Sequence, residues 1–100
     1  MSANACPGTE LIDLDACWQV DPQVAIRRER FGGLAYNYGT RRLSMIRSTA
    51  LLELIASLGE HRSARAAMHA AGIDSDQQPS YAHALRHLLD AGVITRREAR

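Results

Sequence analysis

The chain has 100 residues, of which 46% are hydrophobic and 23% are charged, and its formal net charge at pH 7 is +1. This length suits one compact domain, and the hydrophobic fraction is too high for a disordered chain. The small net charge argues against a surface devoted to nucleic acid, and no stretch is long and apolar enough to span a membrane. No basic start precedes an apolar run, so we expect a cytoplasmic domain without a membrane partner.

The N-terminal part is predicted to be a flexible tail over residues 1–14, because small polar residues, Pro and Gly dominate its beginning. The folded domain is then expected over residues 15–97. Trp18 is the only tryptophan, and we expect it to anchor a short extended segment ahead of the first long strand. Cys6 and Cys17 lack CxxC spacing, so they predict neither a zinc site nor a disulfide, and their role stays open.

The stretch from Val24 to Arg47 carries the alternation of apolar and polar residues that is typical of half-buried strands. Two short glycine-bearing turns, at Phe31-Gly32-Gly33 and at Gly39-Thr40, divide it into three strands. The pattern therefore predicts a three-stranded antiparallel sheet. One face of this sheet must cover the helices, and we expect that face to carry Leu43 and Met45 on the third strand.

Positive charge is concentrated in this sheet, where six arginines stand against a single acid, Glu29. From residue 48 to residue 95 the balance reverses, with three arginines against five acids. The chain contains no lysine, so every fixed cation is a guanidinium that can hold a carboxylate through two hydrogen bonds. The predicted sheet is therefore a basic surface suited to an acidic partner.

After residue 47 the apolar spacing changes to that of helices, and a short apolar run follows them near the end of the chain. Each predicted helix lies between a hydroxyl residue that can cap its start and a glycine that can end it. The three cap and glycine pairs are Ser48 or Thr49 with Gly59, Ser63 with Gly72, and Ser80 with Gly92. The fold class predicted from this order is α+β and winged-helix-like, with a three-stranded antiparallel N-terminal sheet followed by three helices.

The second and third predicted helices would form a helix-turn-helix, which makes a small DNA-binding transcriptional regulator the alternative function. A recognition helix needs exposed cations and amides early in its length. The early exposed positions of the third helix are instead Ala82, His83, Arg86 and His87. One arginine gives this alternative little support, and we predict no nucleic-acid partner.

No pattern in the chain predicts catalysis. Phosphate-binding glycine loops, GxSxG, HExxH and paired catalytic carboxylates are all absent from the sequence. His83 and His87 share the i, i+4 spacing of metal ligands but lack a third ligand, and Cys17 stands beside no oxyanion element. We therefore predict no catalytic residue, no metal and no cofactor.

The run DPQVAIRRERFGGLAYNYGTRRLSMIRS, with the later AAGI and YAHALRHLLDAGVI, resembles the chaperone family of the mycofactocin system. That family is related to the PqqD-like peptide-recognition elements. The resemblance covers about residues 15–95. Its most specific part is the F-G-x-L-x-Y-x-Y-G-x-R-x-L-S pattern from Phe31 to Ser44.

The resemblance implies a non-enzymatic protein that binds the leader of a ribosomally made precursor peptide and presents it to a radical SAM maturase. In such recognition elements the leader adds as a strand beside the third strand of the sheet and lies against the third helix. Arginines beside that edge would favour an acidic leader. Carried over to this chain, the peptide-binding residues are Arg41, Arg42, Leu43, Ser44, Met45, Ile46, Tyr81, Leu85 and Leu88.

Several of these residues keep a second interpretation. For Leu43, Met45, Leu85 and Leu88, a place in the hydrophobic core is favoured over a contact with the peptide. An exposed strand edge also allows two copies to pair or to exchange the sheet, so a homodimer stays an alternative. The motif and direction of the leader, and the surface that the maturase contacts, are left open by the sequence.

Overall fold

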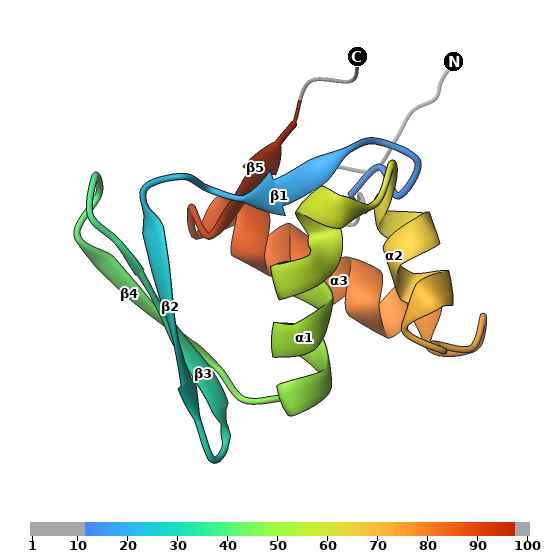
Figure 1. Cartoon of the computed structure of the whole chain (residues 1–100), viewed down its shortest axis with the longest axis horizontal. Coiled ribbons are helices and arrows are strands. Elements are labelled where there is room, and N and C mark those ends of the chain that lie inside the picture. Colours follow the sequence, from blue (N-terminus) through green and yellow to red (C-terminus); the bar gives the residue numbers. More distant parts are fainter. Residues whose placement is uncertain (1–11, 98–100) are drawn as a thin grey trace.

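A computed structural model describes residues 12–97 of the chain, and it has an α+β architecture (Figure 1). In chain order the elements are β1 (Trp18–Val20), β2 (Val24–Glu29), β3 (Gly32–Asn37), β4 (Arg42–Ile46), α1 (Thr49–Ser57), the short 3-10 helix η1 (Leu58–Glu60), α2 (Ala64–Ala70), α3 (Gln78–Asp90) and β5 (Ile94–Arg96). The strands form two antiparallel sheets, β2-β3-β4 and β1-β5. The larger sheet and the three helices were predicted, whereas the second sheet was not.

The larger sheet depends on two glycines that bring β3 close to its neighbours. Gly32 has a φ of +145°, and a Cβ atom there would collide with the carbonyl oxygen of Ile46. A Cβ atom on Gly33 would lie 2.9 Å from the side chain of Leu52 on α1. Both glycines lie inside β3, although the sequence predicted a turn at these residues. The turn is formed by the two preceding residues, Arg30 and Phe31. Their lack of side chains lets α1 pack directly against the sheet.

The buried face of this sheet is the opposite of the predicted one. Ala35 and Ile46 are each 1% exposed and lie on the helix side, whereas Leu43 and Met45 are 62% and 55% exposed. The prediction that Leu43 and Met45 face the core is therefore wrong. Alternation in a strand identifies two faces without saying which is covered. The small residues Ala35 and Gly33 leave room for the helices to pack closely against the sheet, so the face that carries them is the buried one.

The helix starts follow the predicted caps in two cases of three. Ser48 accepts a hydrogen bond from the N–H of Leu51 (3.1 Å), and Ser63 accepts one from Ala66 (3.0 Å). The third helix starts at Gln78, before the predicted cap at Ser80. Pro79 does not prevent this start, because proline is well tolerated in the first turn of a helix. The last two helices end at the predicted glycines, with positive φ angles of 78° at Gly72 and 82° at Gly92. The first helix does not run to Gly59: α1 ends at Ser57, and η1 continues the chain.

The core is mostly aliphatic. It gathers residues from the inner face of the larger sheet and from all three helices. The largest fully buried side chains are Ile46, Leu52, Leu54, Ile55, Leu58, Met68, Leu85, Val93 and Ile94. Burial of this apolar surface, at roughly 25 cal/mol per Å², is the main term that stabilises the domain.

The small sheet joins the two ends of the described chain. Trp18 and Val20 of β1 pair with Arg96 and Ile94 of β5. Trp18 is buried as predicted, and its indole N–H donates to the carbonyl oxygen of Asp13 (2.8 Å). Ile12, which lies within the range predicted to be a flexible tail, is buried against the core. Cys6 and the rest of residues 1–11 lie outside the described residues.

No helix in residues 12–97 combines the length and the apolar character that crossing a membrane requires.

Candidate functional site

The third strand of the larger sheet, β4, is an edge strand. It pairs with β3 on one side, and within residues 12–97 no strand pairs with its other side. The helices cover one face of this sheet, and β4 runs along its border (Figure 1). An edge of this kind offers unpaired main-chain donors and acceptors to another extended chain.

The hairpins determine which residues of β4 offer these groups. A two-residue loop joins β2 to β3, so the pair that closes it, Glu29 and Gly32, must exchange both hydrogen bonds. Hydrogen-bonded pairs alternate along a strand, and the odd-numbered residues of β3 therefore bond toward β4. Their partners are Arg42, Ser44 and Ile46. The main-chain N–H and C=O groups of Leu43 and Met45 consequently point to the free edge.

A groove lies beyond the end of β4, between the first turns of α1 and α3. It has a volume of about 290 Å³ and is lined by Ser48, Leu51, Ser80, Tyr81 and Ala84. At the other end of β4, Nη1 of Arg42 lies 3.4 Å from the carbonyl oxygen of Asp90 at the end of α3. The strand thus begins near the end of α3 and ends near its start. The two ends of β4 therefore lie toward opposite ends of α3, and Tyr81 is half-buried in the groove.

The nine predicted peptide-binding residues fall into two groups in the structure. Arg41, Arg42, Leu43 and Met45 are exposed, while Ser44 and Tyr81 are half-buried at the edge and in the groove. Ile46, Leu85 and Leu88 are 1%, 0% and 7% exposed, and they belong to the core. These three side chains do not offer a contact surface in this conformation. They hold β4 and α3 in place, which is their structural contribution to the site.

The charge around the edge remains positive after its ion pairs are counted. Arg28 binds Glu53 on α1, and Nε of Arg27 lies 2.9 Å from Glu29. Arg41 and Arg47, at the two ends of β4, are exposed and make no ion pair among the described residues. The edge is therefore flanked by guanidinium groups, which favour carboxylates on an approaching chain.

A buried asparagine that the sequence analysis did not single out connects the edge to its helix. Asn37 is 4% exposed, and its side-chain oxygen accepts hydrogen bonds from the N–H groups of Gly39 (2.7 Å) and Thr40 (3.0 Å). Its side-chain NH₂ donates to the carbonyl oxygen of Gly92 at the end of α3 (2.8 Å). One amide thus orders the loop before β4 and ties it to α3. Asparagine directly before a glycine-bearing turn is the signal that could have identified it.

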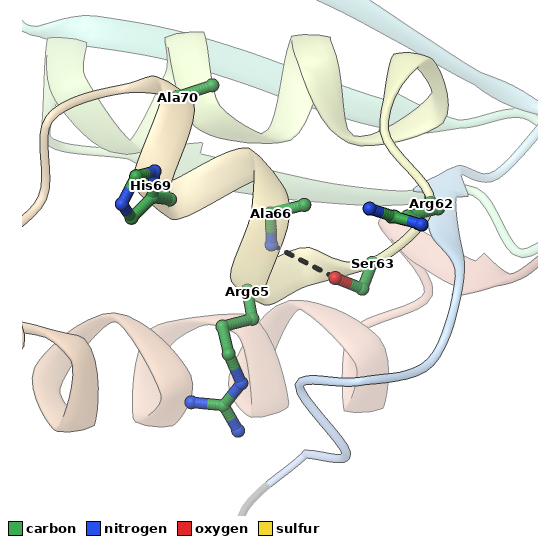
Figure 2. Close-up of a pocket in the computed structure, with 6 residues that line it drawn as sticks. All are labelled: Arg62, Ser63, Arg65, Ala66, His69 and Ala70. Atoms are coloured by element: carbon green, nitrogen blue, oxygen red, sulfur yellow. Dashed lines mark hydrogen bonds between the residues drawn. The ribbon is translucent and has the colours of Figure 1, made fainter.

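A second hollow, of about 480 Å³, lies along α2 and the loop before it (Figure 2). Its lining residues are Arg62, Ser63, Arg65, Ala66, His69 and Ala70. Arg65 is engaged by Asp15, with 2.9 Å between Nε and Oδ1, and this contact lowers the pKa of the Asp15 carboxyl. The hollow is bordered by one short helix rather than by two facing elements. A bound chain would therefore make fewer contacts in this hollow than at the β4 edge.

The residues weighed for metal or DNA binding are not assembled into such sites. No group of three or more metal-ligating side chains occurs within residues 12–97. His83 and His87 are exposed on α3, and Nε of Arg86 lies 3.4 Å from Oδ1 of Asp90. The thiol of Cys17 donates to the carbonyl oxygen of Arg62 (2.9 Å). The final strand, β5, pairs with β1, so the described residues hold no separate wing hairpin after α3.

Comparison with known proteins identifies the family to which most of the chain is similar. The model of the peptide chaperone MftB family matches residues 17–95. The chain is 43% identical over 82 residues to a peptide chaperone MftB from Mycolicibacterium smegmatis, covering 82% of this chain and 80% of that protein. It is 38% identical over 97 residues to the one from Mycobacterium ulcerans, covering 97% and 89%. It is 37% identical over 86 residues to the one from Mycobacterium tuberculosis, covering 86% and 79%. No solved structure gave a significant match.

The chain therefore belongs to the peptide chaperone MftB family. This membership confirms the resemblance found in the sequence. It also supports the prediction that the chain is not an enzyme, because a chaperone is a non-catalytic protein.

Proposed function

We propose that this chain is a chaperone of mycofactocin biosynthesis that binds the leader of a precursor peptide as an added strand at β4. The peptide is then presented to a radical SAM maturase. The observation that carries the proposal is the free edge of β4, where the main chains of Leu43 and Met45 point outward beside the groove at Tyr81. Main-chain bonds would supply affinity, and side-chain contacts in the groove would supply specificity.

The arginines indicate the chemistry of the leader. Arg41 and Arg47 stand at the two ends of the edge, and the larger sheet holds far more cations than acids. An acidic leader would be attracted to this surface and captured faster at low ionic strength. A leader without carboxylates would lose this electrostatic contribution.

The winged-helix-like class remains part of the proposal. Its support is the order of three helices after an antiparallel sheet, with α2 and α3 joined by a short connection. The pairing of β5 with β1 is a departure from that class, because the last strand closes on the N-terminal segment instead of forming a wing.

Direct binding measurements test the proposal. Calorimetric titrations of the full chain with an acidic leader peptide, a charge-neutralised version of it and a random DNA duplex should be made at two salt concentrations. We expect binding of the acidic peptide that weakens with salt, weaker binding of the neutral version and no binding of DNA. Tight, salt-sensitive binding of DNA without binding of the peptide would contradict the proposal.

A second copy of the chain is the competing occupant of the same edge. Pairing of two β4 strands would cover the main chains of Leu43 and Met45 and would block the leader. Sedimentation of the chain with and without peptide distinguishes the two occupants. We expect a peptide-bound species that contains a single copy of the chain, whereas a dimer that excludes the peptide would favour self-pairing.

A further inference from the structure

The larger sheet has an uncovered apolar face, which we call the outer face and define by Arg27, Leu34, Tyr36, Leu43 and Met45. The register places Arg27, Leu34 and Met45 in one row across the three strands, and Tyr36 beside Leu43 in the next. The helices lie on the other side of the sheet (Figure 1). Among the described residues, the exposed large hydrophobic side chains are Phe31, Tyr38, Leu43 and Met45, all of which belong to this sheet or its loops. Clustering of apolar surface in one place is typical of an interaction site.

The charges around the outer face indicate what covers it. The side chain of Arg27 is 80% exposed on the face itself, where it is paired with Glu29, and the charges that stay positive are Arg30 and Arg41, exposed in the two hairpin loops at opposite ends of the sheet. Two copies stacked through this face would bring these like charges together, which is unfavourable. A partner with an apolar centre and a border of carboxylates would complement the surface.

The outer face also adjoins the edge at which the leader is proposed to bind. Leu43 and Met45 direct their main chains to the free edge and their side chains to the outer face. A strand added at that edge would lie about 4.8 Å from β4, and alternate side chains of the strand would extend the same face. The resulting surface would combine side chains of the chaperone with side chains of its bound peptide.

We propose that the outer face binds the enzyme that modifies the peptide, through an apolar patch bordered by carboxylates on that enzyme. This inference rests on the proposed function for the identity of the partner. The partner would contact Leu34 and Tyr36 together with the outward side chains of the bound leader. Peptide and enzyme would therefore bind cooperatively, because each contributes contacts that the other uses.

The test uses substitutions on the outer face that lie away from the free edge. Tyr36→Asp and the milder Leu34→Ser alter the patch on β3, and Arg27→Glu reverses the charge on β2, two strands from the edge. Ala70→Asp and Arg62→Glu introduce the same kinds of change at exposed positions on and before α2. Thermal unfolding of each variant identifies any that are not folded. Affinity is measured first for the leader peptide and then, with the peptide bound, for the radical SAM maturase.

We expect Leu34→Ser, which leaves the charge unchanged, to bind the peptide within twofold of the unmodified chain, and all three outer-face variants to bind the maturase at least tenfold more weakly. The control variants should match the unmodified chain in both measurements, and the unmodified chain should bind the maturase more tightly with peptide than without it. Normal maturase binding by folded outer-face variants would overturn the inference while leaving the proposed function intact. Self-association of the unmodified chain that Tyr36→Asp abolishes would overturn it in favour of a second copy. Failure of the unmodified chain to bind the peptide would overturn the proposed function and, with it, this inference.

Discussion

Asn37 has an influence on the edge that its small side chain does not suggest. It satisfies two N–H groups of the loop before β4 and one carbonyl oxygen at the end of α3. These are the two elements between which the leader is proposed to lie. This buried amide thus links the two elements directly, beside the weaker contact of Arg42 with the carbonyl oxygen of Asp90.

Replacing Asn37 by Ala should destabilise the domain by about 1–3 kcal/mol, since buried partners would be left without hydrogen bonds. Chemical denaturation gives the free energy of unfolding directly. Thr40→Ser, in the exposed loop, keeps the hydroxyl that accepts from the N–H of Arg42 and is the matched control, which should change that free energy by less than about 0.5 kcal/mol. Equal stability of the Asn37 variant and the control would show that the loop does not depend on this amide.

The contact between Asp15 and Arg65 predicts an effect of pH on stability. The guanidinium of Arg65 donates a hydrogen bond to the Asp15 carboxylate and lowers its pKa, with a further contribution from charge attraction. A group whose pKa is lower in the folded state stabilises that state above its unfolded pKa, and the contribution is lost as the pH falls through the folded pKa. The effect belongs to the acidic range and is small, because both side chains are exposed.

Asp15→Asn should therefore make stability less dependent on pH in the acidic range, while changing little at pH 7. Thermal unfolding of both proteins between neutral and strongly acidic pH provides the comparison. Asp76→Asn, at an exposed position in the loop before α3, is a suitable control. An identical acid dependence in the Asp15 variant and the unmodified chain would contradict the assignment.

The sequence predicted the strands and helices better than it predicted their faces. Alternation identified β2, β3 and β4, and hydroxyl caps located α1 and α2. The orientation of the sheet was missed because Leu43 and Met45 look more suitable for a core than Ala35 does. Only the close approach of α1 at Gly33 makes the small residues the buried ones. Such an approach depends on tertiary packing, which a local pattern does not contain.

Some of the predicted site residues are accessible for binding in the structure, and others are buried. The edge residues from Arg41 to Met45 and the groove residue Tyr81 are accessible, whereas Ile46, Leu85 and Leu88 are in the core. The pairing of β5 with β1 was missed because each strand is three residues long and lies at the opposite end of the domain. Neither strand carries a periodic signal long enough to predict a partner.

The alternation of hydrogen bonds along β4 predicts opposite results for proline at neighbouring positions. Met45→Pro removes an N–H from the free edge, which edge strands tolerate. Ser44→Pro removes an N–H that is directed to Ala35 of β3. We expect Met45→Pro to remain folded but to bind the leader about tenfold more weakly, and Ser44→Pro to lose several kcal/mol of stability.

Circular dichroism and peptide titration separate these two outcomes. Met45→Ala serves as the control for the loss of the side chain, and it should bind the leader better than Met45→Pro. If Met45→Pro binds the leader as tightly as Met45→Ala, the N–H of residue 45 is not used by the peptide.

Considered as one unit, the domain separates its stabilising core from its binding surfaces. The helices lie on one side of the larger sheet, while its β4 edge and its outer face stay accessible among the described residues (Figure 1). This division suits the proposed function, in which the chain binds a peptide at one surface and an enzyme at another. The proposed order is the leader at the edge of β4 and the maturase on the adjoining outer face.

Amide hydrogen exchange, resolved by residue with and without an acidic leader peptide, tests strand addition at β4 most directly. In the free chain the amides of Ser44 and Ile46 should exchange slowly, because they bond to β3, and those of Leu43 and Met45 should exchange quickly. Binding of the leader should slow exchange at Leu43 and Met45 most strongly. Unchanged exchange at these two amides in a saturated complex, with new protection elsewhere, would contradict the account.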